Sequence, residues 1–150
     1  QTGGPILDMA VWFTPEFAYE RLNSFSNAAE AYLKIRVIDF FFPAVYGFGF
    51  ACLNCAVYRR KYKNEENYRW IIAVPFAGAL FDYIENIILV ILYRSLPAEY
   101  PAAASVLNII NLLKFGLLGL SILLLVTGFL SLLKGGDSML LMGNKFKGKK

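Results

Sequence analysis

Three long apolar stretches separated by short polar segments dominate the pattern of hydrophobic and polar positions. They are Ile35–Tyr58, Trp70–Tyr93 and Ser105–Lys134. A helix needs about 20 mainly apolar residues to cross the hydrocarbon core of a bilayer, and each stretch provides them. We therefore predict an all-α membrane protein in which residues 35–134 form three transmembrane helices in an antiparallel bundle.

The segment before the first apolar stretch has the pattern of an amphipathic helix. Thr14-Pro15-Glu16 is typical of a helix start, with Thr as the N-cap and Pro in the first turn. Residues 14–34 are too polar to span, and we expect this helix to lie along the membrane surface or to dock on protein. Residues 1–13 show no periodicity and are predicted as a lead-in segment. At helical spacing the apolar stripe consists of Phe17, Leu22, Phe25, Ala29 and Tyr32.

The distribution of basic residues predicts the orientation of the three helices across the membrane. The loop 59–69 and the C-terminal tail 135–150, counted with Lys134, each carry five, whereas Arg94–Ala104 carries one. Gly135-Gly136 is expected to end the third helix. By the positive-inside rule, the loop 59–69 and the C-terminus face the matrix or cytoplasm. The residues expected at the interface, in contact with lipid headgroups, are Arg36, Arg59, Arg60, Lys61, Lys63, Arg69 and Trp70.

Composition narrows the classes of function. Hydrophobic residues make up 57% of the 150 residues, and mean hydropathy is +0.49. The chain has no histidine, which argues against haem, copper and zinc sites. Cys52 and Cys55 share one helix face, and a metal or redox role would need ligands that the neighbouring sequence does not offer. We predict no metal and no cofactor, although a bound lipid fits, and no nucleic-acid partner.

Ionisable residues interrupt the apolar stretches, and such residues are costly in a membrane. With a rise of about 1.5 Å per residue, all of them fall in the half of the bilayer that faces Arg94–Ala104. We expect Lys114 to lie within salt-bridge reach of Asp82 or Glu85, with Asp39 as the next choice. The predicted intramembrane polar cluster contains Asp39, Tyr46, Asp82, Glu85, Asn86, Asn111 and Lys114, with Asn108 nearby.

Two interpretations of this cluster stay open. It fixes helix order and register, or it forms a proton relay, an ion site or a headgroup pocket. Asp82 and Glu85 beside Tyr46 are capable of acid–base chemistry, but no nucleophile, phosphate loop or metal signature accompanies them. No catalytic residue is therefore predicted.

Several strings resemble a set of small uncharacterised integral membrane proteins. They are Trp12-Phe13-Thr14-Pro15-Glu16 with Tyr32-Leu33, Asp39-Phe40-Phe41-Phe42-Pro43 with Tyr46, Phe81-Asp82-Tyr83-Ile84-Glu85-Asn86, and Lys114. The resemblance covers Leu7–Leu133. It implies a four-helix fold, with one further helix upstream of Gln1, and the same buried cluster. It implies no activity.

These observations favour a non-catalytic accessory subunit of a larger membrane complex of respiratory, ATP-synthase or photosynthetic type. Its expected partners are other membrane subunits and lipids, in the mitochondrial inner membrane, the thylakoid or a bacterial inner membrane. The alternative is a stand-alone membrane enzyme or transporter that uses the carboxylates to handle protons, ions or lipid headgroups. That alternative requires a water-accessible cavity that enters from Arg94–Ala104 and reaches Glu85.

Overall fold

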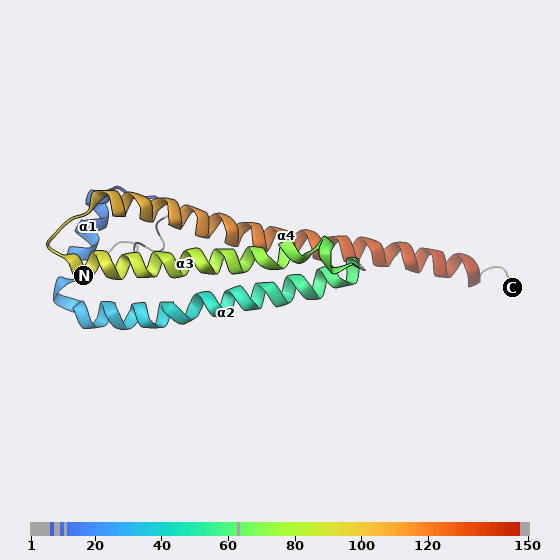
Figure 1. Ribbon diagram of the computed structural model, residues 1–150. Helices are drawn as coiled ribbons and strands as arrows, with labels where there is room; N and C mark the ends of the chain where they lie inside the picture. The colour runs from blue at the N-terminus through green and yellow to red at the C-terminus, as the bar shows by residue number, and fades with distance from the viewer. Residues whose placement is uncertain (1–6, 8–9, 11, 63, 148–150) are drawn as a thin grey trace.

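The computed structural model describes the chain except for residues 1–6, 8–9, 11, 63 and 148–150, and the described part is helical without strands. The side chains of residues 26 and 135–147 are also outside the description. Three long helices lie side by side, and the last projects beyond the other two (Figure 1). The helices are α1 (Pro15–Ser24), α2 (Ala29–Lys61), α3 (Arg69–Ser95) and α4 (Pro101–Lys147), with single 3-10 turns at Ser26–Ala28 and Glu65–Asn67.

Helices α2, α3 and α4 are each long and apolar enough to cross a membrane. Their outer faces carry large hydrophobic side chains such as Phe41, Leu80 and Leu123. The prediction of an all-helical chain with three such helices is confirmed. Pro43 and Pro75 lie inside α2 and α3 and are buried.

The amphipathic segment 14–34 differs from the prediction because it is divided between two helices. The hydroxyl of Thr14 accepts a hydrogen bond from the amide of Phe17 at 3.3 Å, so the expected N-cap is present. Helix α1 then ends at Ser24, whose hydroxyl donates to the carbonyl of Arg21 at 2.7 Å. Ser and Asn side chains compete in this way with helical hydrogen bonds, and the run Ser24–Asn27 contains three of them. Residues 29–34 therefore belong to α2.

Helix α1 packs on the protein. Its buried side chains, Ala18, Tyr19 and Leu22, join Leu89 on α3 and Leu107 on α4 in one apolar core. The hydroxyl of Tyr19 accepts a hydrogen bond from the amide of Tyr100 at 2.5 Å, which ties α1 to the α3–α4 connection. From the expected stripe, Leu22 and Tyr32 are buried, whereas Ala29 is exposed. A second apolar core, at the other end of α2 and α3, contains Tyr58, Tyr68 and Ile71.

Helix α4 does not end at the expected glycines. It begins at Pro101 and continues through Gly135 and Gly136 to Lys147. Glycine weakens a helix by about 1 kcal/mol but ends it only when its backbone turns to positive φ. No glycine in the described part of the chain has a positive φ. The basic side chains expected in the tail 135–150 lie outside the described residues.

Candidate functional site

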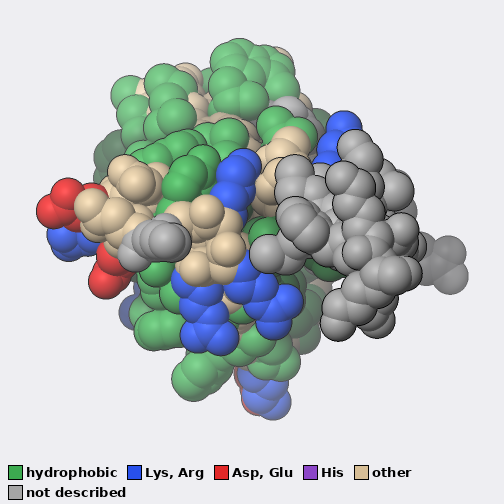
Figure 2. Space-filling model, turned by 90° about the vertical axis from the view of Figure 1, so that its right-hand side faces the viewer, with side chains coloured by type: hydrophobic (Ala, Val, Ile, Leu, Met, Phe, Trp, Pro, Cys, Tyr) green, Lys and Arg blue, Asp and Glu red, His purple; other side chains and the backbone are tan. Residues whose placement is uncertain are grey.

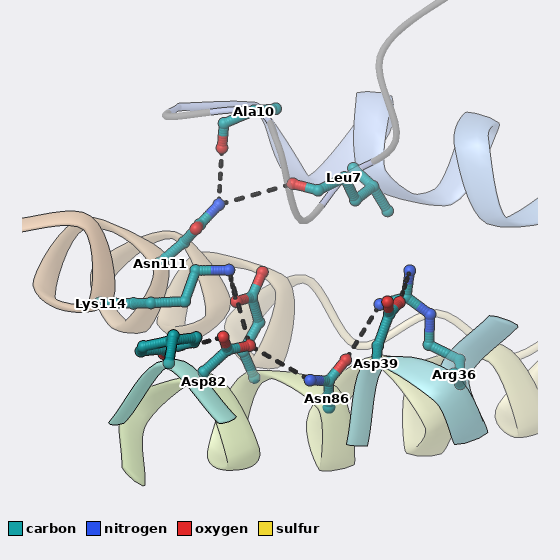
Figure 3. A network of polar contacts seen from close by, with 10 residues as sticks. Leu7, Ala10, Arg36, Asp39, Asp82, Asn86, Asn111 and Lys114 are labelled. Atoms are coloured by element: carbon teal, nitrogen blue, oxygen red, sulfur yellow. Dashed lines mark hydrogen bonds and ion pairs between the residues drawn. The ribbon is translucent and has the colours of Figure 1, made fainter. Parts of the chain in front are cut away.

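The centre of the polar cluster is an ion pair between two helices. The Nζ atom of Lys114 on α4 contacts Oε2 of Glu85 on α3 and lies 3.8 Å from Oδ1 of Asp82 (Figure 3). Only 1% of Glu85 is exposed, and Lys114 is also buried. The pairing expected from helix depth is therefore present. Such a pair is favourable only while both charges remain, because removal of one leaves a buried charge uncompensated.

Asp82 connects this pair to α2. The hydroxyl of Tyr46 donates to Oδ2 of Asp82 at 3.0 Å, and the amide of Asn86 donates to Oδ1 at 3.2 Å. The carbonyl oxygen of Asn86 accepts a hydrogen bond from Arg36 at 3.1 Å. Arg36 also forms a salt bridge of 3.1 Å with Asp39. One continuous network therefore joins α2, α3 and α4.

Asn111 has another role. Its amide donates to the carbonyl oxygens of Ala10 at 2.6 Å and Leu7 at 3.5 Å, above the carboxylates in Figure 3. Asn108, one turn earlier on α4, accepts from the amide of Phe13 at 3.0 Å and donates to its carbonyl oxygen. These two side chains therefore fasten backbone groups of Leu7, Ala10 and Phe13 to α4. The prediction placed Asn111 with the acidic residues because it used only the spacing of side chains. That spacing gives no information about backbone partners.

A cavity of about 200 Å³ lies beside the network, between α2 and α4. Phe42 on its rim is 64% exposed, so this side of the cavity meets the outer surface of the helices. Glu85 lies outside the lining, although its partner Lys114 belongs to it. The lining consists of Asp39, Phe42, Tyr46, Asp82, Asn86, Lys114, Phe115 and Leu118.

The described network contains more acidic than basic groups. Its two cations, Arg36 and Lys114, face three carboxylates, those of Asp39, Asp82 and Glu85. With every group ionised, the network carries one formal negative charge. A buried excess charge favours uptake of a proton or attraction of a cation.

The residues expected at lipid headgroups do not all lie at one end of the molecule. Figure 2 looks onto the end of the molecule that carries the loop 59–69, where basic side chains gather. Of the residues expected at headgroups, those exposed at this end are Arg59, Arg60, Lys61, Arg69 and Trp70. Lys63 lies outside the described residues. Arg36 is instead 4% exposed, because Asp39 and Asn86 bind its guanidinium inside the protein.

Sequence reasoning missed a second polar contact between α2 and α4. The amide of Asn54 donates to the hydroxyl of Ser121 at 3.4 Å, and the hydroxyl of Tyr58 donates to the carbonyl of Leu124 at 2.9 Å. The sequence does contain a signal for this contact. Asn54 follows Gly47 by seven positions and therefore continues the buried face of α2.

Metal binding finds no support in the described part of the chain, where no group of three or more His, Cys, Asp or Glu side chains could hold an ion. Cys52 is exposed, Cys55 is half-buried, and both are free thiols. Comparisons with protein-family models, with curated proteins and with solved structures give no match. The resemblance drawn from the sequence motifs stays a prediction, and function has to be argued from the site.

Proposed function

We propose that this chain is a non-catalytic subunit of a larger membrane protein complex. In this proposal α2, α3 and α4 insert as an antiparallel bundle, and the polar network holds them in register. The bonding pattern supports a holding role. Lys114 is engaged by Glu85 and Asp82, and Asp82 is engaged by Tyr46 and Asn86, so the charged groups bind one another across three helices.

The observation that carries the proposal is the cavity between α2 and α4. Its inner wall has polar groups from Tyr46, Asp82 and Lys114, and its rim includes the exposed Phe42. Lipid tails cannot hydrogen-bond, whereas a protein side chain can add further polar contacts to this wall. A helix from another subunit that packs over Phe42 would close the cavity and supply such contacts.

The charge of the network indicates what such a helix carries. Because the described network holds more carboxylates than cations, a partner side chain with a positive charge or a hydrogen-bond donor fits the cavity. The basic end of the molecule around loop 59–69 supports an orientation with that loop and the C-terminus towards the matrix or cytoplasm (Figure 2). The proposed location is an energy-transducing membrane: the mitochondrial inner membrane, the thylakoid or a bacterial inner membrane.

Site-specific photocrosslinking tests the proposal in the native membrane. A photoreactive phenylalanine analogue at Phe42 should give one discrete protein adduct, because this position borders the cavity. The same analogue at Phe41 is the matched control, since Phe41 is 67% exposed but lies outside the lining. We also expect the chain, extracted in digitonin, to migrate far above its 16.9 kDa. A free monomer with no adduct at position 42 contradicts the proposal.

The excess of carboxylates favours a second candidate, a proton or cation transporter. The cavity counts against it, because this candidate requires a cavity that reaches Glu85, and Glu85 lies outside the lining. The full chain in liposomes would then dissipate a pH or cation gradient, and Asp82→Asn would abolish this activity. Glu65→Gln, in the exposed loop, is the control that should leave it unchanged. Vesicles with the chain that leak no faster than empty vesicles would exclude transport of the tested ion.

A further inference from the structure

A groove on the outer face of α2 and α3 combines an apolar floor with two arginine side chains. It has a volume of about 380 Å³. A second hollow of about 210 Å³ adjoins it and shares Arg36, Phe40 and Val90 with it. The first is lined by Leu33, Arg36, Val37, Phe40, Phe41, Val90 and Arg94, and the second adds Asn86, Ile87 and Ile91.

The two arginines differ in environment. Arg36 is 4% exposed and is held in place by Asp39 and Asn86. Arg94 is exposed in the last turn of α3, and no described carboxylate lies within salt-bridge distance of it. The guanidinium of Arg36 is therefore engaged by Asp39 and Asn86, whereas Arg94 supplies the net positive charge at the end of the groove.

The groove is charged at one end and apolar along the rest of its length, as a phospholipid is. From Arg94, its α3 side continues through Val90 and Ile91 to Ile87, a distance of about 10 Å along the helix. Arg94 lies at the end of a helix that could cross a membrane, where headgroups would be found, and Ile87 lies deeper. Guanidinium binds phosphate through paired, charge-assisted hydrogen bonds. Apolar side chains below it can cover an acyl chain.

We propose that the groove between α2 and α3 binds one anionic phospholipid, with its phosphate on Arg94 and an acyl chain against Val37, Phe40 and Val90. This inference goes beyond the subunit proposal, since a lipid can bind on this face whether or not another protein covers the α2–α4 cavity.

Native mass spectrometry of the full chain in non-ionic detergent tests the site. Phosphatidylglycerol and phosphatidylcholine with identical acyl chains are added in turn, and retained lipid is counted. We expect one retained phosphatidylglycerol and clearly weaker retention of phosphatidylcholine. Arg94→Gln should weaken phosphatidylglycerol binding about tenfold, as for loss of one charge-assisted hydrogen bond. Lys34→Gln is the matched control and should change little, because Lys34 is an exposed cation that pairs with Glu30 and lies outside the lining of the groove.

A second pair of variants tests the apolar part without removing charge. Val37→Trp should fill the groove and reduce retention, whereas Val45→Trp, on the same helix but outside the lining, should not. Equal retention of the two lipids, or equal losses in Arg94→Gln and Lys34→Gln, overturns the proposal. So does full displacement of the lipid by inorganic phosphate, because the acyl chain would then contribute nothing.

Discussion

The ammonium group of Lys114 on α4 lies against the carboxylate of Glu85 on α3, and only 1% of Glu85 is exposed. The same ammonium is 3.8 Å from Asp82, which binds Tyr46 on α2. One cation therefore stands at the junction of three helices.

Replacement of Lys114 should show how far the stability of the fold depends on this cation. We expect Lys114→Met to lower the free energy of unfolding by about 3–5 kcal/mol, because Glu85 would stay buried without a counter-charge. Lys114→Met combined with Glu85→Leu should recover much of the loss. Thermal unfolding in one detergent, followed by circular dichroism, gives the comparison. If Lys114→Met is as stable as the parent, the ion pair makes no net contribution.

Gly128 marks the tightest contact between α4 and α2. A Cβ atom added there would lie 2.7 Å from the ring of Tyr58 and 2.8 Å from Val57, and Tyr58 is held by its bond to Leu124. Gly128→Ala should therefore destabilise the fold by about 1–3 kcal/mol through overpacking. Gly119→Ala is the control: nothing lies within 4 Å of its added Cβ. There we expect unchanged or raised stability, since Ala favours helix by about 1 kcal/mol over Gly. Equal effects of the two substitutions would contradict this packing.

Asn108 should control the attachment of the lead-in segment. In Asn108→Ala, Phe13 loses both of its bonds to α4. At about 1 kcal/mol for each bond, the amide of Phe13 should exchange with solvent roughly 5- to 30-fold faster. Hydrogen–deuterium exchange measures this rate directly. Asn23→Ala, at an exposed position of α1, should leave the rate as it is, and an unchanged rate in Asn108→Ala would show that other contacts hold the segment.

The proposed orientation can be tested with single cysteines. Cys52→Ala with Cys55→Ala provides the background, and little loss of stability is expected since neither thiol is fully buried. Glu66→Cys should then react with an impermeant thiol reagent only from the matrix or cytoplasm side. Glu99→Cys should react only from the opposite side. Labelling of both from one side would rule out the predicted topology.

The ionic centre could be predicted because helices have fixed geometry. A constant rise and the i, i+3 and i, i+4 neighbours are enough to place Asp82, Glu85 and Lys114 at one depth from their sequence positions. The same reasoning could not give the partners of Asn111, because they are backbone carbonyls of a segment without periodicity. It also failed at Ser24, where a local hydrogen bond helps end α1 within an amphipathic pattern that continues to Lys34.

The attachment of Ala10 and Phe13 to the last helix has a consequence for biogenesis. These two residues bind Asn111 and Asn108, which are about 95–101 positions later in the sequence. During synthesis at roughly 5–20 residues per second, they wait several seconds for their partners. For a shorter part of this interval, while the residues between them are made, Asp82 and Glu85 also lack the cation of Lys114. We therefore expect the emerging α2–α3 hairpin to depend on the insertion machinery or a membrane chaperone until α4 arrives.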